Sequence, residues 1–114
     1  MNSRQKGARG EREWRDELMA QGYQARRGQQ FSGSPDSPDV VCDGLPYHQE
    51  VKRVEKLNLQ DAVDQASRDC GGKPWILAHR RNDQPWLGTM LASEFFRLVR
   101  EALPVTKSEP EPNG

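Results

Sequence analysis

The stretch Pro38-Asp39-Val40-Val41-Cys42, followed by Asp43-Gly44-Leu45-Pro46, decides the fold of this chain. The first part is a short apolar run with two β-branched residues, which favours a buried strand. The second part contains an Asp-Gly pair and a proline, which are the usual signals of a turn. Because residues 47–54 again suit a strand, the sequence predicts a β-hairpin with strands at residues 39–42 and 47–54.

Charged side chains of this hairpin are predicted to meet. Asp39 stands at the start of the first strand, and Glu50 and Lys52 share one face of the second because side chains alternate along a strand. Carboxylate oxygens are the ligands that Mg²⁺ prefers, and an ammonium group can orient a water molecule or stabilise a phosphate. The hairpin therefore predicts metal-dependent phosphodiesterase chemistry. His48 falls on the same face, where we expect it to be solvated rather than to contact DNA or metal-bound water.

A helix is predicted over residues 8–21, before the hairpin. At about 100° per residue, Glu11 lies on the apolar stripe of this helix, whereas Glu13 lies off the stripe and is expected to point to solvent. A carboxylate on a buried stripe is costly unless it is paired or binds a metal. Two interpretations remain open: Glu11 points at the acids of the hairpin, or it forms an ion pair with an arginine at the edge of the core, such as Arg26.

The remaining elements follow from periodicity, caps and turn residues. They are a strand at 23–27, a loop at 28–38, a helix at 59–70 capped by Asn58, strands at 74–79 and 85–90, and a last helix capped by Ser93. The order αβββαββα predicts an α/β fold, with a mixed sheet and helices on its faces. We expect residues 1–103 to form one domain that begins with a mobile basic arm at 1–8, and residues 104–114 to be disordered.

Composition narrows the class of protein. The net charge is zero, but the first 27 residues carry seven basic and four acidic side chains, so a basic face for DNA is compatible with a neutral chain. No apolar run is long enough to span a bilayer, and the N-terminus lacks the apolar stretch of a secretory signal. We therefore expect a cytoplasmic protein that does not contact a membrane.

Several stretches match one nuclease superfamily. They are Lys6-Gly7-Ala8-Arg9-Gly10-Glu11-Arg12-Glu13, Gly22-Tyr23 with Arg26, Ser32-Gly33-Ser34, Pro38-Asp39-Val40-Val41, Glu50-Val51-Lys52 and Gln65. Through them the chain resembles the PD-(D/E)XK nucleases, and within these the archaeal-type Holliday junction resolvases and their phage relatives. The resemblance covers about residues 4–100, is strong over the first 55 and is looser afterwards.

The resemblance implies a restriction-endonuclease-like core and a homodimeric endonuclease that hydrolyses phosphodiester bonds in branched DNA. It implies Mg²⁺, for which Mn²⁺ would substitute, held by Glu11, Asp39 and Glu50. Lys52 would orient the attacking water, and Ser32 would lie beside the scissile phosphate. The chain departs from the pattern at Asp36, which crowds the loop before Asp39 and could compete as a ligand.

Contact with DNA is assigned mainly to the basic residues near the N-terminus. The candidates are Arg4, Lys6, Arg9, Arg26 and Arg27, and the resemblance adds Gln65. The run His79-Arg80-Arg81 suits either a phosphate contact or an ordinary charged surface, and the Phe95-Phe96 pair suits either the core or a dimer interface. Two alternatives remain for the function: a flap, single-strand or restriction-type nuclease of the same fold, or a DNA-binding protein without catalytic activity.

Overall fold

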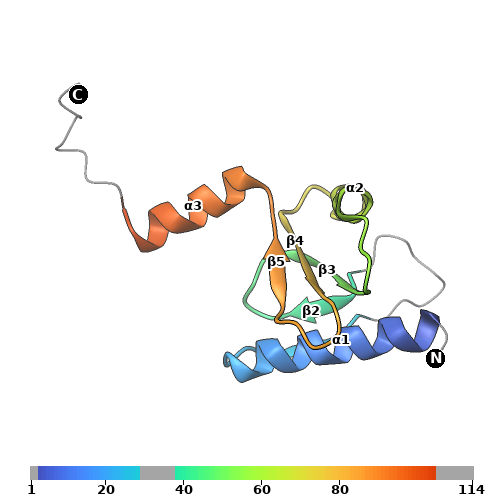
Figure 1. Ribbon diagram of the computed structural model, residues 1–114. Coiled ribbons are helices and arrows are strands. Elements are labelled where there is room, and N and C mark those ends of the chain that lie inside the picture. Colours follow the sequence, from blue (N-terminus) through green and yellow to red (C-terminus); the bar gives the residue numbers. More distant parts are fainter. Residues whose placement is uncertain (1–2, 29–37, 105–114) are drawn as a thin grey trace.

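The computed structural model describes residues 3–28 and 38–104, with side chains described from residue 7 onward. Its elements are α1 (Ser3–Ala20), β1 (Ala25–Arg27), β2 (Val40–Cys42), β3 (His48–Arg53), α2 (Leu59–Asp69), β4 (Trp75–Arg80), β5 (Leu87–Thr89) and α3 (Ala92–Ala102) (Figure 1). The sheet has the strand order β1-β2-β3-β4-β5. The pairing of β3 with β4 is parallel and the other pairings are antiparallel. The predicted α/β fold and element order are confirmed.

The hairpin of β2 and β3 forms as predicted. Val40 lies opposite Gln49 in the antiparallel pair, and the backbone amide of Asp39 donates to the carbonyl of Gln49 at 3.0 Å. Across the other edge of β2, the amide of Gly28 donates to the carbonyl of Asp39 at 2.8 Å. A side chain at Gly28 would meet the carbonyl oxygen of Pro38 at 1.9 Å, so only glycine allows this close approach. The backbone of Asp39 is therefore fixed on both sides.

Helices α1 and α2 cover opposite faces of the sheet (Figure 1). The α1 face encloses Leu18, Val40, Cys42 and Val51, with Trp14, Ala25, Leu45 and Trp86 packed against them. The α2 face encloses Ala62, Ala66, Trp75 and Leu77, with Leu57, Val63 and Cys70 packed against them. Since side chains alternate along β3, the even-numbered residues from His48 face α2 and the odd-numbered ones face α1.

Two predicted boundaries are wrong. α1 begins at Ser3, so residues 3–7, predicted as part of a mobile arm, are helical. Arg4, Gln5 and Lys6 are good helix formers, and nothing there interrupts the helix. In the last helix the capping position is Leu91, and Ser93 lies inside the helix. The extended backbone of Leu91 places its carbonyl to accept from the amide of Phe95 at 3.1 Å, which starts the helix earlier.

Helix α3 leaves the end of β5 and extends away from the sheet (Figure 1). None of its residues is buried, although Phe95, Phe96 and Leu103 are large and apolar. Its first turn is anchored to the body, because the Tyr47 hydroxyl lies 3.3 Å from Glu94 and accepts from Arg97 at 3.2 Å. Among the described residues, no helix is long and apolar enough to cross a bilayer.

Candidate active site

Asp39, which is half-buried just before β2, and Glu50, which is buried in β3, form a pair of carboxyl groups in the hairpin. Glu50 is 2% exposed, and one oxygen of Asp39, Oδ2, accepts from the backbone amide of Val51 at 2.8 Å. Burial raises the pKa of Asp39 to about 8, and the negative charge of Glu50, a hydrogen bond with Glu50 and the charge of Glu11 act in the same direction. The Val51 amide opposes this increase. Asp39 therefore retains its proton to a higher pH than an ordinary carboxyl group when no cation is bound beside it.

His48 holds Glu50 from the other side. Its Nε2 lies 2.7 Å from Oε1 of Glu50, and the ring is only 5% exposed. The expectation that His48 is solvated is therefore wrong. His48 pairs with the buried Trp75 of β4, on the face that α2 covers, and this packing removes the ring from solvent.

Glu11 lies toward the sheet, as its helical position predicts, and it is bound by an arginine. Nε and a terminal nitrogen of Arg27 both donate to Oε1 of Glu11, at 3.1 and 3.0 Å. An ion pair with an arginine such as Arg26 was one of the two interpretations left open, and the structure shows such a pair with Arg27 instead. Because both donors use Oε1, the other oxygen of Glu11 has no hydrogen bond to any residue that the structure describes.

Glu13 does not point to solvent, which corrects the helical-face prediction. Its Oε1 accepts from Nε of the buried Arg53 at 2.8 Å and lies 3.6 Å from Arg80, while Oε2 pairs with Arg9 at 3.1 Å. Long arginine side chains from β3 and β4 reach around the edge of α1 to the carboxylate. At Gly10 an added Cβ would lie 2.8 Å from Cβ of Arg53, so the glycine lets the helix approach β3 closely enough for this cluster to form.

Lys52 lies two residues after Glu50 on the same face of β3 and is half-buried. It forms no ion pair with any residue in the described part of the chain. Its partner in the parallel register is His79 of β4, whose Nε2 lies 2.8 Å from the Thr89 hydroxyl. Lys52 thus lies on the same strand face as Glu50 but forms no ion pair with it. An ammonium group in this position suits contact with a phosphate.

The donor set around Asp39 fits a hard divalent cation. The half-buried Asp39 and the buried Glu50 repel one another when both are ionised, and an ion that prefers oxygen ligands, such as Mg²⁺, would stabilise them. Glu11 contributes negative potential, but within the described residues no three acidic, histidine or cysteine side chains form a group of metal-ligand dimensions. The structure thus brings Asp39 and Glu50 together and leaves Glu11 as a neighbour bound to Arg27.

The predicted DNA contacts are only partly described. Arg9 and Arg27 are paired with the α1 acids, and Arg26 lies 3.5 Å from Asp43. Gln65 is half-buried on α2. The predictions for Ser32 and Asp36, and for the side chains of Arg4 and Lys6, lie outside the described residues.

Two partners of the site acids were missed in the sequence. Strand alternation already places His48 on the same face as Glu50. Burial of the His48 ring could have been predicted only by recognising that α2 covers this face of the sheet. Arg27 carried no local signal beyond its charge, because its pairing with Glu11 depends on how α1 lies over β1.

The chain matches no protein-family model and no curated protein. Among solved structures it is similar to Hjc, a Holliday junction resolvase from the archaeal hyperthermophile Archaeoglobus fulgidus. The two chains are 26% identical, with a TM-score of 0.57 over 74% of this chain and 75% of the other. The shared fold confirms the resemblance to the PD-(D/E)XK nuclease superfamily, and within it to the archaeal Holliday junction resolvases, that the sequence indicates.

Proposed function

We propose that this chain is a divalent-metal-dependent DNA endonuclease that acts on branched DNA, with a Holliday junction as the preferred substrate. The observation that carries the proposal is the close pair of Asp39 and the buried Glu50, with Lys52 on the same strand face as Glu50, in a fold shared with a Holliday junction resolvase. A carboxyl group whose pKa is raised by burial and by a neighbouring acid, as that of Asp39 is, is a feature of many functional sites.

In this proposal Asp39 and Glu50 hold Mg²⁺, Mn²⁺ substitutes for it, and Glu11 supplies further negative charge from α1. The ion, when bound, polarises the scissile phosphate and lowers the pKa of the attacking water. Lys52 orients that water and offsets the negative charge that develops on the phosphate. His48 fixes the carboxylate of Glu50, and Arg27 holds one oxygen of Glu11. Ser32 is proposed to lie beside the scissile phosphate.

The proposed enzyme is a homodimer that associates through α3. This helix presents Leu91, Phe95, Phe96 and Leu103, each more than half exposed, and none of its own residues is buried in the chain. Several large apolar side chains exposed on one short helix, two of them in ring contact, suit a subunit interface. A twofold pair would carry two active sites, as the cutting of two opposed strands at a four-way junction requires.

The experiment that tests the proposed function is cleavage of a synthetic four-way junction. We expect nicks in opposed strands with Mg²⁺ or Mn²⁺, no cleavage with EDTA, and binding without fast cleavage in Ca²⁺. Flap and single-strand substrates distinguish the nuclease alternatives, and linear duplex distinguishes a restriction-type enzyme. Binding without cleavage of any substrate in any of these ions would instead identify a non-catalytic DNA-binding protein.

A further inference from the structure

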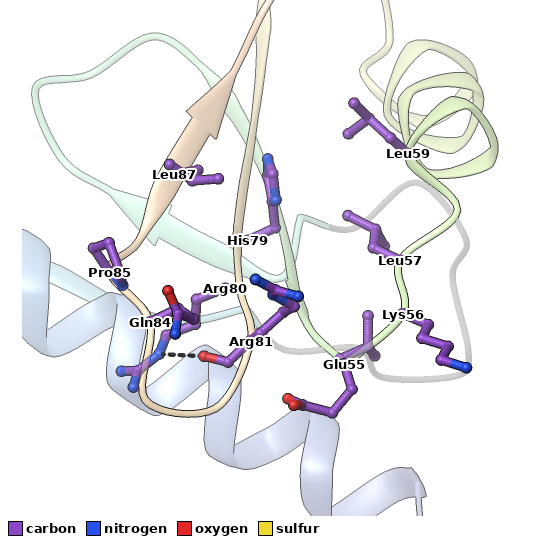
Figure 2. Close-up of a pocket in the computed structure, with 11 residues that line it drawn as sticks. Glu55, Lys56, Leu57, Leu59, His79, Arg80, Arg81, Gln84, Pro85 and Leu87 are labelled. Carbon is purple, nitrogen blue, oxygen red and sulfur yellow. Dashed lines mark hydrogen bonds between the residues drawn. The ribbon is translucent and has the colours of Figure 1, made fainter.

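A pocket of about 500 Å³ lies beyond the ends of β3 and β4, beside the candidate active site (Figure 2). One wall is the connection from β3 to α2, with Leu57 and Leu59, and the opposite wall is the β4–β5 hairpin, with Leu87. His79 and Arg81 lie between the two walls (Figure 2). Apolar walls with a few convergent polar groups, in this range of volume, are typical of ligand sites.

The charges around this pocket favour an anion. Lys56 and Arg81 line it and form no ion pair with any residue for which the structure gives a side chain. The acid at the rim, Glu55, keeps its negative charge, and its Oε2 is directed to the backbone amide of Asn82, from which it accepts at 2.6 Å. Arg80 is directed toward Glu13. Two cations therefore remain available at the mouth of an apolar pocket.

The base of the pocket carries no charge at neutral pH. Burial lowers the pKa of His79, and its Nε2 is already hydrogen-bonded to the Thr89 hydroxyl. A neutral ring between leucine side chains accepts an uncharged planar group, whereas a phosphate would bind at the cationic mouth. The pocket is thus divided into an apolar interior and a positively charged rim.

The pocket adjoins the proposed catalytic residues directly. His79 is the register partner of Lys52, and paired residues of neighbouring strands project from the same face of a sheet. Neighbouring strands are about 4.8 Å apart, and successive nucleotides rise about 3.4 Å along a duplex strand. If a phosphate of a DNA strand contacts Lys52, a nucleotide one or two positions along that strand therefore lies over the pocket.

We infer that this pocket binds one unpaired nucleotide of the DNA substrate next to the scissile phosphate. Its base lies between Leu57, Leu59 and Leu87, and its phosphate contacts Arg81 and Lys56. This inference rests on the proposed nuclease function. A base in the pocket has left its stack and its partner, which costs least where DNA is already branched or single-stranded. The pocket would thus select branched DNA over continuous duplex.

The first test asks whether the pocket takes a base, and it requires no cleavage. Titration of the wild-type protein with a short oligothymidylate should shift the methyl resonances of Leu57, Leu59 and Leu87. The methyl groups of Leu18, in the cluster under α1, serve as the internal control. Shifts of the methyl resonances of the pocket leucines without shifts of those of Leu18 support the inference. If neither set shifts, or if both shift equally, the inference is wrong.

The second test places the nucleotide in the substrate. A series of four-way junctions is prepared, each with a single 2-aminopurine at a different nucleotide around the cleavage point. The fluorescence of each junction is measured as the protein binds it in Ca²⁺. We expect a rise at one position within two nucleotides of the scissile phosphate, because the base leaves its stack. Leu87→Thr and Arg81→Gln should remove most of this rise and lower kcat/KM on the junction by about tenfold.

The variants have a matched control. Leu87 is 57% exposed and Arg81 is exposed, so neither change disturbs the core. Arg68→Gln removes a similar exposed charge from the far end of α2 and should leave both the fluorescence rise and kcat/KM unchanged. If Leu87→Thr and Arg81→Gln behave like Arg68→Gln while the wild type still cuts junctions, the inference about the pocket is wrong and the proposed nuclease function is unaffected. If the wild type cuts no DNA at all, the proposed function itself fails.

Discussion

His48 Nε2 lies 2.7 Å from Glu50 Oε1, and both side chains are almost completely buried. A carboxylate inside a protein has several rotamers, and this contact favours the one in which Glu50 also interacts with Asp39. Hydrogen-bonded partners of this type set the geometry of metal ligands from outside the coordination sphere. His48 is thus a positioning residue for Glu50 in the proposed mechanism.

The first prediction concerns that contact. His48→Leu removes the hydrogen bond, so metal affinity or activity should fall by about 10- to 100-fold. His48→Gln retains a side-chain donor and should recover part of the loss. The measurement is a Mg²⁺ titration of junction cleavage, with a thermal melt to verify the fold. A His48→Leu protein with the wild-type Mg²⁺ midpoint and rate would show that the contact only packs the core.

The second prediction concerns Asp39 and pH. Its pKa is raised to about 8 in the folded protein from an ordinary value of 3.8, so between these limits the folded state binds the proton more tightly than the unfolded state. The contribution of Asp39 to stability is therefore greatest at low pH and is lost as the pH rises to 8. Without metal, Asp39→Asn should be more stable than the wild type at pH 8, by a few kcal/mol, and similar to it at pH 4.

Urea denaturation of both proteins at the two pH values measures this difference. Mg²⁺ should stabilise the wild type more at pH 8 than at pH 5, since it competes with the proton on Asp39, and should have little effect on the variant. Asp39→Asn should also abolish cleavage and retain DNA binding. An Asp39→Asn enzyme that cuts at the wild-type rate would exclude this residue from the site.

The third prediction separates the two acids of α1. Glu13→Gln leaves the buried guanidinium of Arg53 without its anionic partner, which should lower the stability by about 3 kcal/mol and leave the chemistry at the hairpin intact. Glu11→Gln should instead lower the cleavage rate by at least tenfold with a smaller effect on stability, because its partner Arg27 is largely exposed. Equal rate losses after correction for the folded fraction would mean that Glu11 does not act on the site.

These two acids also illustrate what the sequence could and could not predict. The strand pattern of β2 and β3 placed Asp39, Glu50 and Lys52 correctly, because alternation and turn chemistry are local properties. The prediction that Glu13 points to solvent was wrong, because it considered only the apolar stripe of the helix. The arginines that reach it come from β3 and β4, and only the packed sheet brings them there. Burial of His48 likewise required the packing of α2.

The fourth prediction concerns the basic start of the chain. Neutralising Arg4, Lys6 and Arg9 together should weaken junction binding. The slope of log K against log salt should fall by about 0.9 for each phosphate that the protein no longer neutralises. Cleavage at saturating protein should persist, because none of the three is among the proposed metal-binding or catalytic residues. Arg68→Gln is the control. A triple variant with an unchanged salt slope would place the phosphate-binding residues elsewhere.

The fifth prediction concerns α3. Phe96→Asp puts a charge on a side chain that is 55% exposed, so the monomer should fold while the proposed dimer dissociates. Light scattering should show half the wild-type mass, and the nicks in opposed strands should become independent events. Arg100→Gln on the same helix is the matched control. A wild-type protein that is monomeric both free and on DNA would favour the flap or nicking alternative.

The close approach of Gly28 to Pro38 separates the position of Asp39 from the length of the connection that precedes it. The backbone bonds of Asp39 to Gly28 and to Gln49 hold this residue on both sides. Lengthening a loop whose ends are already held costs little, about 0.6 kcal/mol for each doubling. An insertion between Gly28 and Pro38 should therefore leave the backbone of Asp39, and with it the geometry of the acid pair, in place.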